Sequence, residues 1–121
     1  MGQDVGQDGA KTGAMTSFTL RDLEKRVQER AATSADVSYT RKLIDKGIPH
    51  CAKKLGEEAV ETVLAAVAED RDRLISETAD LLYHLMVVLH ARGVTLTDVE
   101  AALAQRTGQS GLEEKASRKR D

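Results

Sequence analysis

The stretch Lys53-Lys54-Leu55-Gly56-Glu57-Glu58-Ala59-Val60-Glu61 joins a helical pattern to a dense group of acids, and Glu77-Thr78-Ala79-Asp80 answers it further along. Residues three or four apart share one face of an α-helix, so Glu58 and Glu61 project together, as do Glu77 and Asp80. Carboxylates at this spacing repel one another unless a positive charge lies between them. We therefore expect a bound cation at this place.

Magnesium is the cation that such a group favours, because Mg²⁺ takes oxygen ligands, keeps some of its water and usually acts on phosphates. The hypothesis is a pair of antiparallel helices that presents four or five carboxylates to Mg²⁺ and a polyphosphate. The alternative is a solvated acidic helix face, which is common in helices with this charge content. Glu61 and Asp80 lie among apolar neighbours rather than alternating charges, and this favours the metal site.

Composition predicts a soluble, all-α protein of one domain. The chain has 121 residues, one proline and only three aromatic residues, while alanine, leucine and charged residues are plentiful. The net charge of −2 gives no basic field for nucleic acid or an anionic membrane, and no apolar run has the length of a membrane span. A single cysteine, Cys51, excludes an intrachain disulfide and fits a reducing, cytoplasmic compartment.

Apolar periodicity and capping signals predict helices that end at recognisable stops. Thr19 with Asp22 resembles a capping box, Ser38 is a second N-cap, and Thr97 with Glu100 is a third start. The expected helices cover residues 19–32, 38–47, 49–68, 74–92 and 97–106. Residues 1–16 read as a disordered tail, 17–107 as the domain, and 108–121 as a polar segment that orders only on a ligand or partner.

The short polar break at residues 69–72 predicts an antiparallel helical hairpin. In such a hairpin Glu77 and Asp80 return opposite Glu58 and Glu61, which closes the acidic site. The expected fold is thus all-α, with four to five helices around a central hairpin. The helix over 74–92 is apolar on more than one side, so we expect a homodimer to complete the bundle.

Four segments carry a resemblance to a known family. They are Ser38-Tyr39-Thr40 with Lys46-Gly47, Lys54-x-Gly56-Glu57-Glu58-Ala59-x-Glu61, Glu77-x-Ala79-Asp80-Leu81-Leu82-Tyr83-His84-Leu85 and Ser110-Gly111-x-Glu113-x-Lys115-Ala116-Ser117. Over residues 18–119 the chain resembles phosphoribosyl-ATP pyrophosphohydrolase, of the MazG-like all-α nucleotide pyrophosphohydrolases. The acidic pattern alone indicates only the superfamily. The segments that begin at Ser38 and at Ser110 restrict the resemblance to the phosphoribosyl-ATP pyrophosphohydrolases.

The resemblance implies Mg²⁺-dependent hydrolysis of 1-(5-phosphoribosyl)-ATP to the AMP derivative and pyrophosphate, the second step of histidine biosynthesis. It also implies a homodimer and leaves open an association with phosphoribosyl-AMP cyclohydrolase. Carried over by position, Glu58, Glu61, Glu77 and Asp80 are expected metal ligands. Glu57 is a further ligand or the group that aligns the attacking water, so Glu57, Glu58 and Glu61 form the expected catalytic set.

Further residues are expected to hold the anionic substrate. Lys54 follows the family motif as a phosphate contact, and Lys42 is a second cation. Tyr39 and Thr40 offer hydroxyl groups to ribose or phosphate. His84, one turn after Asp80, is either a hydrogen-bond partner that fixes a ligand carboxylate or a histidine satisfied at the edge of the bundle.

Two other functions use the same residues. The metal site could serve the hydrolysis of a different (d)NTP in a house-cleaning enzyme with another base pocket. Alternatively, the acidic face could recognise a basic partner in a helical interaction module without turnover. Pyrophosphate release from phosphoribosyl-ATP and from a panel of dNTPs distinguishes the three.

Overall fold

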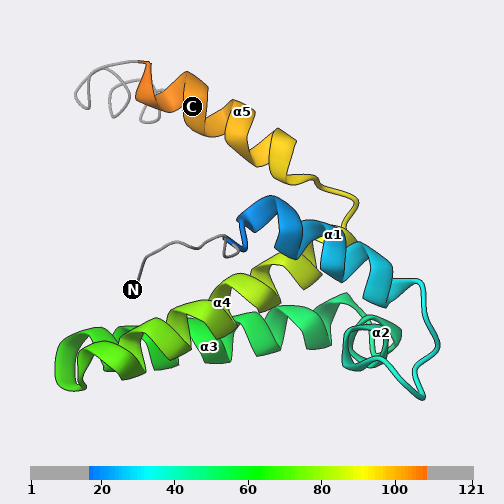
Figure 1. The fold of residues 1–121 in the computed structure, drawn as a ribbon, viewed down its shortest axis with the longest axis horizontal. Helices are drawn as coiled ribbons and strands as arrows, with labels where there is room; N and C mark the ends of the chain where they lie inside the picture. Colours follow the sequence, from blue (N-terminus) through cyan, green and yellow to red (C-terminus); the bar gives the residue numbers. More distant parts are fainter. Residues whose placement is uncertain (1–16, 109–121) are drawn as a thin grey trace.

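The computed structural model describes residues 17–108, in which all regular structure is helical. Five helices follow in order: α1 (Leu20–Ala31), α2 (Tyr39–Asp45), α3 (Ile48–Ala68), α4 (Arg71–Ala91) and α5 (Leu96–Thr107) (Figure 1). The all-α prediction is confirmed. The expected tail at 1–16 and nearly all of the expected polar segment at 108–121 lie outside the described residues.

The hairpin of α3 and α4 is the centre of the fold, as predicted. The two long helices lie side by side, and α1 and α2 contact α4 beyond the hairpin (Figure 1). The prediction that the second helix begins at Leu74 is wrong, because α4 begins three residues earlier at Arg71. Asp70 caps it by accepting the backbone N–H of Arg73 at 2.9 Å. The first turn of α4 is polar and shows no apolar periodicity, so the apolar pattern did not predict that it is helical.

The other caps were predicted in part. Thr19 forms a reciprocal capping box with Asp22, and the Ser38 hydroxyl accepts the N–H of Arg41, both as expected. The prediction for α5 is wrong, because its capping box is Thr95 with Asp98 rather than the pair two residues later. Thr97 accepts a hydrogen bond from Arg21 of α1 at 2.8 Å, and Glu100 forms an ion pair with the same arginine. These two residues hold α5 to α1 instead of capping it.

The core lies where α1, α2, the start of α3, the second half of α4 and the first residue of α5 meet. Its buried members are Val27, Leu43, Cys51, Met86, Val87 and Leu96. Among the hydrogen bonds that tie α2 to its neighbours, the Ser38 hydroxyl donates to the Arg30 carbonyl at 2.8 Å, and the Thr40 and Tyr83 hydroxyls are 2.6 Å apart. The first half of α4 therefore extends beyond the core, and it carries Glu77 and Asp80.

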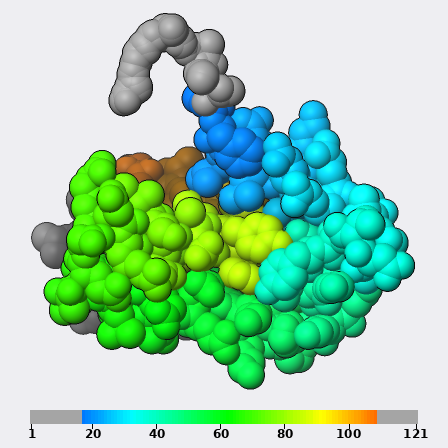
Figure 2. Space-filling view, turned by 60° about the horizontal axis from the view of Figure 1, so that its bottom comes forward, coloured from blue at the N-terminus to red at the C-terminus, as the bar shows by residue number. Residues whose placement is uncertain are grey.

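Surplus apolar surface lies mainly on α3. Val60, Val63, Leu64 and Val67 recur at helical spacing and are all more than half exposed, with Val67 at 82%. We refer to these four side chains as the α3 stripe. The expectation that the surplus lies on α4 is wrong for most of that helix, because Leu82, Leu85 and Val88 are each partly buried. Figure 2 shows the face on which α3 and α4 run from the hairpin tip towards α2.

None of the described helices has the length and apolar character needed to cross a bilayer.

Candidate active site

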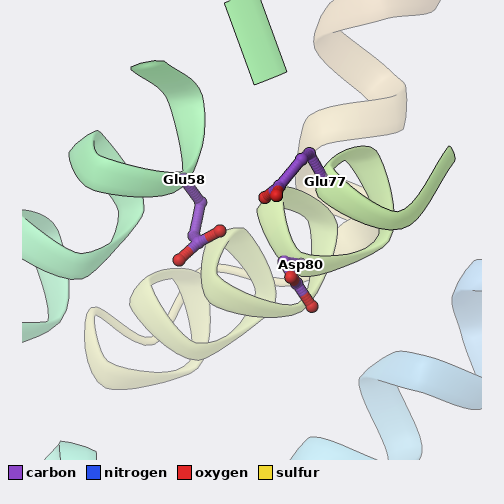
Figure 3. Close-up of side chains that lie close together, drawn as sticks. All are labelled: Glu58, Glu77 and Asp80. Carbon is purple, nitrogen blue, oxygen red and sulfur yellow. The ribbon is translucent and has the colours of Figure 1, made fainter. Parts of the chain in front are cut away.

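Three carboxylates converge between the two long helices. Glu58 projects from α3, while Glu77 and Asp80 project from successive turns of α4 (Figure 3). One oxygen of each lies within 4.8 Å of the others. Helical spacing puts Glu77 and Asp80 on one face of α4, and the hairpin turns that face towards Glu58. The predicted convergence is therefore observed for three of the four expected ligands.

A threonine ties the two helices together at the same level. The Thr62 hydroxyl lies 2.8 Å from the Glu58 carbonyl oxygen in its own helix and 3.2 Å from the Glu77 carbonyl oxygen in α4. A serine or threonine in a helix commonly donates to a carbonyl one turn back. Here the second oxygen belongs to the neighbouring helix, so Thr62 supplies one of the contacts that place Glu58 opposite Glu77.

The three carboxylates differ in burial and in their partners. Glu77 is buried, Glu58 is partly buried, and Asp80 is exposed. Glu77 is paired with Arg73, whose Nη2 lies 2.8 Å from Oε2. Burial raises the pKa of Glu58, and the negative charges of Asp80 and Glu77 raise it further. The Glu58 carboxylate thus lies in a site with more negative charge than its protein neighbours neutralise.

The donors fit a hard divalent cation. All three are carboxylate oxygens, the ligands that Mg²⁺ prefers in proteins. In octahedral coordination with Mg–O distances of about 2.1 Å, neighbouring oxygens lie about 3 Å apart and opposite ones about 4 Å apart. The oxygens of the group lie within 4.8 Å of one another, which is close to this range. Part of the site is solvent-exposed, which leaves room for water and phosphate.

The other predicted acids lie beside this group. Glu61 is exposed on α3, and its carboxylate is not part of the close group, although its charge contributes to the raised pKa of Glu58. Glu57 is also exposed and pairs with Lys54 at 3.5 Å. The expected roles of Glu57 and Glu61 remain predictions, and both lie within one turn of Glu58.

The expected substrate contacts occupy different environments. Lys54 is half-buried on the same helix as Glu58, whereas Lys42 and Tyr39 are exposed on α2. Thr40 is buried, and its hydroxyl forms a hydrogen bond with the Tyr83 hydroxyl, so in this structure Thr40 joins α2 to α4. Lys54, Lys42 and Tyr39 are accessible for the predicted binding, and the role of Thr40 in substrate binding remains a prediction.

His84 is more enclosed than a histidine at the bundle edge. It is buried one turn beyond Asp80, with its ring edge-to-face with Tyr83 at a centroid distance of 5.0 Å. Burial lowers the pKa of His84, and the nearby charge of Lys54 lowers it further, against the opposing effects of Asp80 and Glu57. Within residues 17–108 no hydrogen bond joins His84 to a carboxylate, so its role in fixing a metal ligand remains a prediction.

Arg73 is the site residue that sequence reasoning missed. The sequence predicts Lys54 and Lys42 as contacts for the substrate, and that prediction includes no cation as a partner of the acids. The signal was present, because Arg73 and Glu77 are four residues apart on one helix face. An arginine at this spacing from an acid on an apolar helix face is a candidate ion-pair partner.

Comparisons with known proteins agree with the geometry. The family model described as phosphoribosyl-ATP pyrophosphohydrolase matches residues 20–107. A Rhodopseudomonas palustris protein named phosphoribosyl-ATP pyrophosphatase 1 is 66% identical over 107 residues, which are 88% of this chain and the whole of that protein. Proteins named phosphoribosyl-ATP pyrophosphatase from Nitrobacter winogradskyi and Azorhizobium caulinodans are 64% and 67% identical, over 88% and 84% of this chain and 92% and 94% of their own lengths. The chain therefore belongs to the phosphoribosyl-ATP pyrophosphohydrolase family.

Proposed function

We propose that this protein hydrolyses 1-(5-phosphoribosyl)-ATP to 1-(5-phosphoribosyl)-AMP and pyrophosphate in histidine biosynthesis, with Mg²⁺ as its cofactor. The activity follows from close relatives that carry this name over nearly their whole length. The observation that supports the chemistry is the convergence of Glu58, Glu77 and Asp80 between α3 and α4. A divalent cation held by this group of carboxylates would neutralise their charge and could bind the polyphosphate at the same time.

The cation would supply charge neutralisation at the phosphate oxygens and a more acidic water. Glu58, Glu77 and Asp80 would hold it. Glu57 and Glu61, which are exposed and close to Glu58 along α3, are the carboxylates available to orient the attacking water and accept its proton. The burial of Glu77 keeps one ligand in place, while the exposure of Asp80 leaves the substrate a route to the cation.

The substrate's negative charge requires cations close to the carboxylates. Lys54 lies one turn before Glu58 on α3, whereas the other expected substrate contacts lie on α2. Its ion pair with Glu57 is long, at 3.5 Å, and both partners are substantially exposed, so the pair is weak enough for a phosphate to replace the carboxylate. Lys42 and Tyr39 on α2 are further contacts in this proposal.

The α3 stripe supports a homodimer. Four aliphatic side chains at helical spacing on a surface helix make an apolar patch that monomeric proteins rarely leave in water. A second copy related by a twofold axis would present the same stripe, so that the two helices pair through self-complementary surfaces. A cytoplasmic location and association with phosphoribosyl-AMP cyclohydrolase are further parts of this proposal, and they rest on the family resemblance.

The test is pyrophosphate release from phosphoribosyl-ATP, measured beside a panel of dNTPs with Mg²⁺ and with EDTA. We expect release from phosphoribosyl-ATP that needs the cation and exceeds release from every dNTP. A preference for a dNTP would assign the protein to the house-cleaning class. No release from any substrate would favour a helical interaction module.

A further inference from the structure

Arg73 links the acidic site to the tip of the hairpin. Its Nη2 lies 2.8 Å from Oε2 of Glu77, and its Nε lies 3.3 Å from Oε1 of Glu69. Glu69 is the C-cap residue of α3, so the guanidinium group connects the residue that follows one helix with a buried acid of the next. The side chain of Glu77 is only 8% exposed, whereas that of Arg73 is 53% exposed.

We propose that Arg73 is a built-in counter-cation of Glu77, which a divalent cation must displace and which Glu69 then retains at the hairpin tip. The proposal rests on the metal site of the proposed function. It concerns a residue of this chain that competes with the metal, and the family resemblance assigns Arg73 no role.

The charge of Glu77 explains why such a partner is needed. A buried carboxylate without a compensating charge is costly, and Glu77 faces two further acids, Glu58 and Asp80. Arg73 is the cation that contacts Glu77 directly among residues 17–108. In the metal-free protein it therefore offsets a repulsion that would otherwise loosen the hairpin.

The position of Arg73 also explains how it can give way. A guanidinium ion and a divalent cation that neutralise the same carboxylate repel each other at close range. Arg73 is half in solvent and already lies beside Glu69, so moving away from Glu77 does not leave its charge without a partner. The same arginine can thus occupy two positions, one before and one after the cation binds.

Thermodynamic linkage gives the proposal a direction. If Arg73 and the metal compete for Glu77, removing Arg73 tightens metal binding and destabilises only the metal-free protein. If Arg73 instead holds Glu77 in the orientation that a metal needs, removing it weakens metal binding, commonly by about 10-fold or more. The two roles predict opposite signs for one measurable quantity.

The experiment measures Mn²⁺ binding to the full chain without substrate, from the free Mn²⁺ signal in electron paramagnetic resonance. Mn²⁺ serves as the probe because it prefers the same oxygen ligands as Mg²⁺. The variants are Arg73→Gln, Arg73→Lys and a matched control, Arg71→Gln. Arg71 lies in the same turn of α4 and loses the same charge, but its side chain is 85% exposed, and its ion-pair partner within residues 17–108 is Asp72, at 3.9 Å.

We expect Arg73→Gln to lower the Kd for Mn²⁺ by about 3- to 10-fold, the range for a charge-assisted bond discounted for an exposed arginine. The midpoint of thermal unfolding should fall in EDTA and return to the wild-type value at saturating Mn²⁺. Arg73→Lys should remain close to wild type in both measurements, and Arg71→Gln should match wild type. The circular dichroism spectrum of each variant checks that it is folded.

Three outcomes would overturn the proposal. An unchanged or raised Kd in folded Arg73→Gln, while the wild type binds Mn²⁺, would exclude competition and leave the metal site standing. If Arg71→Gln lowered the Kd for Mn²⁺ as much as Arg73→Gln, the tighter binding would be due to the change in net charge and not to the loss of the contact with Glu77. If the wild type bound no Mn²⁺, the metal site of the proposed function would be wrong, and the role of Arg73 with it.

Discussion

The Thr62 hydroxyl of α3 lies 3.2 Å from the Glu77 carbonyl oxygen of α4, so one hydrogen-bonding group spans the hairpin at the level of the acidic site. Residues 62 and 77 are brought together by a break of only two residues between α3 and α4. Such a turn fixes the direction of the second helix but leaves its rotation to side-chain contacts. Thr62 supplies one of these contacts beside Glu58 and Glu77.

Replacing Thr62 with valine should therefore destabilise the hairpin. The substitution keeps the shape of the side chain and removes the hydroxyl, so we expect the free energy of unfolding in urea to fall by about 0.5–1.5 kcal/mol. The matched control is Thr107→Val at the exposed end of α5, where within the described residues the hydroxyl bonds to carbonyls of its own helix. An equal loss in both variants would show that the contact across the hairpin contributes nothing.

The raised pKa of Glu58 predicts a pH dependence in the metal-free protein. Burial and neighbouring acids make the folded state bind the Glu58 proton more tightly than the unfolded chain does. This contribution is fully present below the ordinary value of 4.5 and is lost as the pH rises through the raised value. In EDTA, Glu58→Gln should therefore gain stability relative to wild type as the pH rises above 4.5.

Urea unfolding of wild type and Glu58→Gln at a series of pH values measures this difference directly. Glu29→Gln, which changes an exposed acid on α1, is the control and should run parallel to wild type. Saturating Mg²⁺ should remove the advantage of Glu58→Gln, because the cation neutralises the charge that the variant lacks. A difference that does not change with pH would contradict the electrostatic description of the site.

Asp80→Asn should reduce pyrophosphate release by about 100-fold or more, since a catalytic cation supplies several kcal/mol of transition-state stabilisation. Asp80 is exposed, so the loss should occur without a fall in stability. Asp72→Asn on the same helix, where the side chain is 95% exposed, is the matched control and should keep full activity. The measurement is the initial rate at saturating phosphoribosyl-ATP and Mg²⁺. Wild-type rates in folded Asp80→Asn would remove Asp80 from the site.

The α3 stripe predicts the oligomeric state. Val63→Glu places a charge in the middle of the stripe, and burying it unpaired at an interface should weaken self-association by about 100-fold or more. Light scattering with size-exclusion chromatography should show a dimer for wild type and a monomer for the variant. Val37→Glu, at another exposed valine in the connection before α2, should remain dimeric. A wild-type monomer at high concentration would contradict the proposal.

Local patterns predicted much of this fold and its acidic site. Helical spacing and a short break were enough to place Glu77 and Asp80 opposite Glu58, because both depend on near neighbours in the chain. The start of α5 was missed because two threonines each precede an acid by three residues. Only the contacts of Arg21 with Thr97 and Glu100, from a distant helix, separate these alternatives.

The remaining errors concern relations that no single helix contains. The surplus apolar surface was expected on α4, but whether an apolar side chain is covered depends on which other helices pack on it. In the structure α1 and α2 cover α4, and Val63 and Val67 of α3 stay exposed. Glu61 lies beside the close group of carboxylates rather than inside it. Its position depends on how α3 and α4 are rotated about their axes, and the spacing of residues along one helix does not determine this rotation.

The claim that Glu58, Glu77 and Asp80 share a cation is tested most directly by a crystal structure with Mn²⁺, using anomalous scattering to locate the ion. We expect a peak between α3 and α4 within bonding distance, about 2.1 Å for a magnesium-like ion, of an oxygen from each of the three side chains. A peak elsewhere, or these carboxylates facing bulk solvent without an ion in every copy of the chain, would contradict it.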